Sequence, residues 1–145
     1  MYHVTYEHEI EYRDIYGKLL PILPMAFERN GHAFFHLMLV DTGADKIALP
    51  ANSAERLGIS LIDDCIPDIT LSLGGQSEVY RYAGKIRMSI PDLDDEWFME
   101  CSVLFSPALD KRSYGLLGRE CTLAHLAFGF HEKNGYHAFL VSLFS

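Results

Sequence analysis

The feature that most constrains this chain is an apolar run that ends in a carboxylate. Residues 37–40 are all apolar, and Asp41, Thr42 and Gly43 follow at once. A continuous apolar run is typical of a buried strand, and burying a carboxylate costs free energy unless specific groups compensate for it. We therefore expect Asp41 either to cap a turn or to take part in chemistry.

Most of the remaining chain alternates between apolar and polar residues with the period of a half-buried strand. Turn residues separate these segments, among them Asn30-Gly31, Gly74-Gly75 and Asn134-Gly135. Pro21 and Pro24 cannot donate to a β-ladder, so they are expected at an edge or in an irregular strand. The expected strands are residues 2–12, 18–27, 32–40, 69–73, 79–90, 97–105, 128–131 and 136–144.

Two short helices are expected among these strands. The first lies within 51–59, where Asn52 or Ser53 is a possible cap and Gly58 a stop signal. The second is indicated by the spacing of apolar residues within 123–127. A strand-rich chain with two short helices predicts an all-β barrel or sandwich with helical insertions.

Composition narrows the class of protein. A chain of 145 residues that is 49% apolar fits one compact domain, so residues 1–145 are expected to share a single core. The net charge of −8 argues against a nucleic-acid partner, because such proteins gather Lys and Arg on one surface. No apolar run reaches the roughly 18 residues that a membrane span needs, so no membrane partner is expected.

The cysteines and the first residues bear on location. Cys65, Cys101 and Cys121 are odd in number, widely separated and without zinc-site spacing, which favours a reducing compartment. The first dozen residues have no basic segment followed by an apolar one, as a secretory leader would. We therefore expect a soluble, cytoplasmic protein.

Two short motifs carry a resemblance to a known family. The stretch 41–44 is Asp-Thr-Gly-Ala after an apolar strand, and about seventy-five residues later 116–119 is Leu-Leu-Gly-Arg before an expected helix. With a glycine-bearing hairpin between them, this order resembles the retropepsin-like aspartic proteases from about Leu19 to Phe144. The resemblance implies a closed acid-protease barrel with one or two short helices, and an aspartic endopeptidase that acts on polypeptides as a homodimer.

The resemblance also assigns roles to residues. It makes Asp41 the catalytic aspartate, with Thr42 locking two active-site loops together across the dimer and Gly43 allowing the tight turn. It pairs Asp45 with Arg119 behind the site. Further support of the site is assigned to Ala44 and Gly118, and the candidates for a flap over the substrate are Leu73, Gly74, Gly75 and Gln76.

Chemistry explains why such a chain needs a partner copy. One carboxyl group cannot be at once the base for an attacking water and the acid for the leaving amine, so two carboxyl groups share one proton. The chain has a single Asp-Thr-Gly. A two-fold homodimer supplies the second Asp41, and the apparent pKa values then belong to the pair. Such a reaction uses water as the nucleophile and needs neither cofactor nor metal.

Other interpretations remain open at this stage. The fold is also compatible with a catalytically silent dimeric binding or regulatory module, or with an unrelated ligand-binding barrel in which Asp41 only caps a turn. Gly74-Gly75 also fits an ordinary hairpin turn, and the final apolar strand is either interleaved across a dimer or a plain core strand. His32 and His36 lack further zinc ligands, and the acidic run 92–96 lacks the spacing of a calcium loop.

Overall fold

The structure, a computed structural model, describes residues 5–72 and 75–144. Its strands are β1 (His8–Glu11), β2 (Arg13–Ile15), β3 (Lys18–Leu20), β4 (Ile22–Arg29), β5 (His32–Val40), β6 (Ala48–Pro50), β7 (Cys65–Ser72), β8 (Gly75–Tyr82), β9 (Ile86–Ile90), β10 (Asp94–Cys101), β11 (Leu104–Ser106), β12 (Gly115–Leu117), β13 (Leu126–Lys133) and β14 (Tyr136–Leu143). Its short helices are η1 (Ala51–Leu57), η2 (Pro107–Leu109) and α1 (Thr122–His125).

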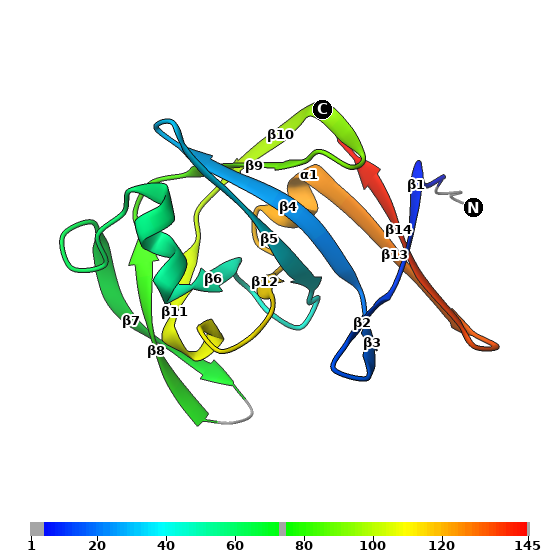
Figure 1. Cartoon of the computed structure of the whole chain (residues 1–145), viewed down its shortest axis with the longest axis horizontal. Helices are drawn as coiled ribbons and strands as arrows, with labels where there is room; N and C mark the ends of the chain where they lie inside the picture. Colours follow the sequence, from blue (N-terminus) through cyan, green and yellow to red (C-terminus); the bar gives the residue numbers. More distant parts are fainter. Residues whose placement is uncertain (1–4, 73–74, 145) are drawn as a thin grey trace.

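The described strands form three sheets. The largest has nine strands in the order β10-β9-β4-β5-β12-β6-β11-β8-β7. A second has the order β1-β14-β13, and β2 pairs with β3 in a small ribbon. Figure 1 shows the β7–β8 hairpin at the lower left and β10 at the top, so the two edges of the large sheet lie apart. The mostly-β prediction is therefore confirmed, whereas the expected closed barrel is wrong, because these two edge strands do not pair.

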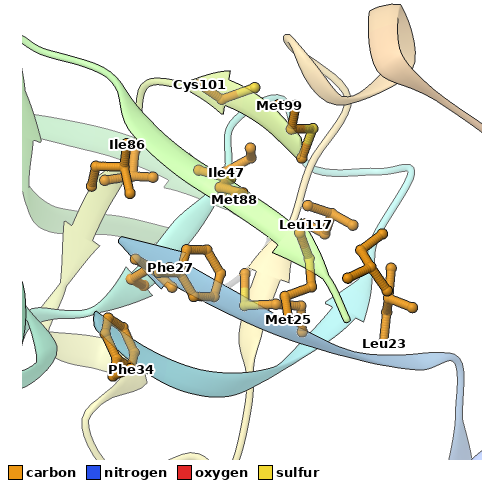
Figure 2. Packing of buried hydrophobic residues seen from close by; sticks show 14 of the residues in the cluster. Leu23, Met25, Phe27, Phe34, Ile47, Ile86, Met88, Met99, Cys101 and Leu117 are labelled. Atoms are coloured by element: carbon orange, nitrogen blue, oxygen red, sulfur yellow. The ribbon is translucent and has the colours of Figure 1, made fainter. Parts of the chain in front are cut away.

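The β4–β5 hairpin is the centre of the core. It turns at Asn30 and Gly31, which both have the positive φ that this turn requires (50° and 82°), and this confirms the predicted hairpin. Phe27 of β4 and Phe34 of β5 stack with ring centroids 5.4 Å apart. Figure 2 shows them among buried side chains from several other strands. Pro24 lies in β4 before its pairing with β9 begins, as expected for a residue that cannot donate.

Both predicted helices are present, with different boundaries. Gly58 ends η1 in a left-handed conformation (φ 68°), as predicted, but neither predicted cap is used. The Ser53 hydroxyl instead donates to the Pro50 carbonyl at 2.6 Å from within the helix. The second helix, α1, ends at His125 because residues 126–133 pair with β14 along their whole length, and this sheet pairing overrides the local helical spacing.

The sheet β1-β14-β13 is formed by the two ends of the described chain. Its strand β14 lies between β1 and β13, so the final apolar segment is a central strand of its own protomer. Phe139 and Val141 of β14 are fully buried. The turn at Asn134-Gly135 is confirmed, while residues 2–4 of the predicted first strand lie outside the described residues.

Candidate active site

The loop at 41–44, here called the aspartate loop, lies beside the second motif at 116–119. The reason is that β5 and β12, which lead into them, run parallel. Leu117 of β12 is in register with Val40 of β5. As both strands end there, the Asp41 N–H donates to the Leu117 carbonyl at 3.1 Å. The fold therefore brings together the two motifs that the sequence separates by about seventy-five residues.

The Asp41 side chain is held by its own loop. The Gly43 N–H donates to Asp41 Oδ1 at 3.0 Å, and the Ala44 N–H donates to the Asp41 carbonyl at 3.2 Å. Asp41 is partly buried, and Thr42 and Gly43 are exposed. This hydrogen bond from a backbone N–H orients the Asp41 carboxylate. It also offsets part of the free energy that burying the charge costs.

Gly43 contributes space rather than backbone freedom. Its φ is not positive, so a left-handed backbone is not the reason for glycine at this position. A Cβ at Gly43 would lie 3.3 Å from Asp41 Oδ1, which is tighter than nine in ten Cβ contacts. The absence of a side chain therefore keeps the surroundings of the Asp41 carboxylate open.

A set of contacts between 44–46 and 119–120 fixes the loop from behind. The Arg119 N–H donates to the Ala44 carbonyl at 3.0 Å, and the Glu120 N–H donates to the Asp45 carbonyl at 2.7 Å. The expected ion pair between Arg119 and Asp45 is formed. A second ion pair joins Lys46 to Glu120, and sequence reasoning missed it because nothing local marks the two residues as neighbours. We call these four contacts the loop brace.

Gly118 permits the close approach on which the loop brace depends. A Cβ at this residue would lie 2.3 Å from the Lys46 carbonyl oxygen, which is a backbone atom that cannot rotate away. The second motif therefore requires glycine at this position for a steric reason.

A pocket of about 460 Å³ opens beside Asp41. Its wall is formed by Tyr12, Pro21, Leu39, Val40, Asp41, Thr42, Phe130 and Glu132. Tyr12 lies directly after β1 and Glu132 lies in β13, and the Tyr12 hydroxyl donates to Glu132 Oε1 at 2.8 Å. Burial, this hydrogen bond and the carboxylate charge raise the pKa of Tyr12 to about 12, so the hydroxyl keeps its proton. Sequence reasoning missed both residues, since they are 120 positions apart and belong to no motif.

The hairpin of β7 and β8 is the segment in which the flap candidates lie. Gly75 and Gln76 begin β8, and Leu73 and Gly74 lie outside the described residues. Ile69 and Leu71 of β7 are 59% and 79% exposed, an unusual degree for large apolar side chains. Within one protomer, Gly75 and Gln76 are not among the residues that line the Asp41 pocket.

The cysteines differ from the sequence-based expectation. Cys101 at the end of β10 and Cys121 before α1 form a disulfide, so the expectation of reduced cysteines is wrong for this pair. Cys65 is free and buried. His125 lies near the disulfide. The possible ligand atoms of Cys101, Cys121 and His125 are close enough to one another to hold a metal ion. Both sulfurs are occupied by the bond between them, so they are not available as thiolate ligands.

Comparison with known proteins identifies the class. A family model described as aspartyl protease matches residues 25–121, which include the aspartate loop and the second motif. The chain therefore belongs to this aspartyl protease family, and the resemblance to retropepsin-like proteins is confirmed.

A solved structure supports the same fold. The retropepsin-like aspartic protease from Rickettsia conorii is similar with a TM-score of 0.59 and 19% sequence identity, over 94% of this chain and 99% of that chain. A search of curated proteins found no match. Among the described residues, no helix combines the length and the apolar composition that crossing a membrane requires.

Proposed function

We propose that this protein is an aspartic endopeptidase that acts as a homodimer, with one Asp41 from each copy. The observation that carries the proposal is the placement of Asp41 at the end of β5, beside an open pocket and on a loop that the second motif fixes from behind. A residue that only capped a turn would need neither the pocket nor the loop brace.

The proposed reaction follows from the pairing of two carboxyl groups. One Asp41 is protonated and the other is ionised, and together they bind the water that attacks the peptide carbonyl. The ionised carboxylate takes a proton from the water as its oxygen attacks the peptide carbonyl carbon. The protonated carboxyl group gives its proton to the leaving nitrogen as the C–N bond breaks, which yields the amine and the acid. In this proposal Thr42 contacts its counterpart in the partner, and the β7–β8 hairpin covers the bound peptide.

The edges of the three-stranded sheet β1-β14-β13 support a specific dimer. Because β14 is already paired on both sides, the two edges of this sheet among the described residues are β1 and β13. Phe130 of β13 is 45% exposed and lines the Asp41 pocket together with Glu132. Side chains stand perpendicular to a sheet, so β13 can pair with a second copy through its backbone while these two side chains still face the pocket. We infer that β13 pairs with β13 of the partner subunit.

The test compares wild-type protein with Asp41→Asn. Asn retains an oxygen that accepts the Gly43 N–H, so the variant is expected to fold and to sediment as the same dimer. We expect wild type to cleave members of a peptide library between mildly acidic and neutral pH, and the variant to cleave none. A strictly monomeric wild type, or equal cleavage by the variant, would contradict the proposal.

The alternative of a silent dimeric module predicts a different result. In that case both proteins are dimers and neither cleaves the library. A statine-type peptide distinguishes the two functions further, since such mimics of the transition state engage both carboxyl groups. Tight binding that depends on Asp41 supports the protease.

A further inference from the structure

Three side chains with the chemistry of metal ligands meet where β10 ends beside α1. Cys101 is the last residue of β10, Cys121 comes directly before α1, and His125 ends α1. Their possible ligand atoms all lie within 4.8 Å of one another. Cys101 is fully buried, whereas the other two are half-buried and reachable from solvent. We call this group the cysteine–histidine cluster.

The fold holds each member of the cluster in place. Cys121 and His125 are four residues apart across one helical turn, a separation that brings side chains together on one side of a helix. The Cys121 carbonyl accepts the Ala124 N–H at 3.2 Å, and the His125 carbonyl accepts the Phe144 N–H at 2.9 Å. Cys101 lies in the paired part of β9 and β10. One ligand therefore comes from a sheet and two come from one turn of helix.

Two thiolates and one imidazole form a ligand set that suits zinc. Zinc sites with two cysteines, one histidine and a water molecule are known, and the water takes the fourth position of the tetrahedron. The ligand atoms of such a site lie about 3.5–4 Å apart, given the usual zinc–sulfur and zinc–nitrogen distances. The spacing in the cluster is close to this value, so small movements bring all three ligands onto one ion.

The charges beside α1 do not oppose a cation. Arg119 is ion-paired with Asp45, and Glu120 is ion-paired with Lys46. These four charges compensate one another in pairs. The helical side of the cluster is therefore close to neutral, and binding of two thiolates to Zn²⁺ adds no net charge there.

The charges on the side of β10 are directed away from the cluster. Glu100 and Arg87 lie opposite each other on β10 and β9, so their charges also compensate. Lys85 and Arg87 flank Ile86, which is the residue opposite Cys101. Both cations are exposed, whereas Ile86 and Cys101 are fully buried. The two cations therefore extend into solvent, and the sulfur of Cys101 lies in the interior.

We propose that Cys101, Cys121 and His125 bind Zn²⁺ when the disulfide is reduced, with water as the fourth ligand. In the oxidised chain the disulfide joins β10 to the residue that follows Glu120 of the loop brace. In the reduced chain the zinc ion makes the same link. His125 takes no part in the disulfide, and the zinc site gives this residue a role. The inference goes beyond the proposed function and does not depend on peptide cleavage.

The change of state is a thiol–disulfide exchange with a dithiol reductant. A thiolate of the reductant attacks the sulfur of Cys121, the less buried of the two cysteines, and the S–S bond breaks so that Cys101 leaves as a thiolate. The second thiol of the reductant closes its own disulfide and releases Cys121, so the reductant supplies two electrons. Zn²⁺ then binds both thiolates, and the two protons of the reductant pass to solvent.

The experiment measures zinc binding by the reduced chain. Wild type is reduced with dithiothreitol, separated from it without oxygen and titrated with Zn²⁺ against a chromophoric chelator. We expect one zinc ion for each reduced chain and none for the oxidised chain. Co²⁺ in place of Zn²⁺ should give a thiolate-to-metal charge-transfer band together with the visible bands of a tetrahedral site. If the reduced chain is unfolded without metal, Zn²⁺ should refold it. Reduced protein that takes up no zinc overturns the inference.

Variants assign the zinc ion to the cluster. His125→Gln leaves both cysteines in place, so when oxidised it should unfold at the same urea concentration as wild type. When reduced, it should bind zinc about a hundredfold more weakly or worse, since even indirect partners of a zinc ligand contribute about 10–100-fold. Two matched controls should bind zinc as wild type does, namely His131→Gln at an exposed histidine and Cys65→Ser at the free cysteine.

The remaining outcomes decide between the cluster and other ligands. The variant Cys101→Ser/Cys121→Ser should take up no zinc at this site, and uptake equal to that of reduced wild type overturns the inference. Equal zinc affinity in His125→Gln and wild type overturns it as well, and so does loss of the zinc in Cys65→Ser. Zinc binding that requires the cluster upholds the inference even if the protein cleaves no peptide, so its test is separate from that of the proposed function.

Discussion

Arg119 forms an ion pair with Asp45 across the two segments that carry the motifs of the site. Both side chains are more than half exposed, and exposed ion pairs contribute roughly 0–1 kcal/mol to stability. The pair is therefore better suited to holding the loop in one geometry than to stabilising the fold. We expect Asp45→Asn to change the free energy of unfolding by less than about 1 kcal/mol.

The same variant should affect catalysis more strongly. A small displacement of a catalytic group reduces the rate by large factors, so kcat/KM of Asp45→Asn should fall by about tenfold or more. Urea unfolding and cleavage of one peptide, measured on the same preparation, check both parts. A loss of stability as large as the loss of activity would show that the pair serves the fold instead.

Gly118 should be among the least replaceable residues of the site. A Cβ there would meet the Lys46 carbonyl oxygen at 2.3 Å, so either the loop brace or the second motif must move. We expect Gly118→Ala to lower the free energy of unfolding by about 1–3 kcal/mol, the usual cost of forced overpacking. Gly43→Ala is the comparison, because its Cβ would meet a side-chain oxygen at 3.3 Å and should cost less. Equal stability of Gly118→Ala and wild type in urea would contradict the steric reason given for this glycine.

The disulfide between Cys101 and Cys121 should stabilise the fold measurably. It closes a loop of 20 residues, and cross-links of this length lower the entropy of the unfolded chain by the equivalent of about 3 kcal/mol. The double variant Cys101→Ser/Cys121→Ser should therefore unfold at lower urea concentration, and dithiothreitol should shift wild type but not the variant. Cys65→Ser, at the free cysteine, should still respond to dithiothreitol. A wild type that is insensitive to dithiothreitol would contradict the bond.

His36 should make the fold sensitive to acid. Burial, and more weakly the charge of Arg56, lower the pKa of His36 below its usual value of 6.5. Its Nε2 is buried and has no hydrogen-bond partner among the described residues. Below pH 6.5 the unfolded chain takes up a proton that the folded chain does not, so stability should fall as the pH decreases toward the lowered pKa.

The contribution of His36 is measured by comparing pH 7 with pH 5. In His36→Phe the difference in unfolding free energy between these two values should be smaller than in wild type. His131→Gln, at an exposed histidine of β13, serves as the control and should keep the difference. The same pH dependence in His36→Phe and wild type would place the acid sensitivity elsewhere.

Local chemistry explains what the sequence predicted well. The turns at Asn30-Gly31 and Gly58 require a positive φ, and the residue types there report that requirement directly. The apolar run before Asp41 likewise predicted β5, whose last four residues are all buried or partly buried.

The features that were missed depend on distant parts of the chain. Tyr12 and Glu132 are 120 positions apart, and Cys101 and Cys121 meet only because β10 ends beside the second motif. The boundary between α1 and β13 was misplaced for a related reason, since β14 supplies a pairing partner that local spacing does not reveal. Whether a sheet closes is decided by its two edge strands, and no local pattern specifies how they meet.

The central claim is that the hydrolytic site consists of two Asp41 carboxyl groups from two copies of the chain. It is tested most directly by unfolding wild type and Asp41→Asn together in equal amounts, refolding the mixture and measuring peptide cleavage at constant total protein. If each site needs two intact carboxyl groups, random pairing leaves about a quarter of the wild-type activity. Retention of about half of the activity would show that each chain works alone, and it would contradict the account.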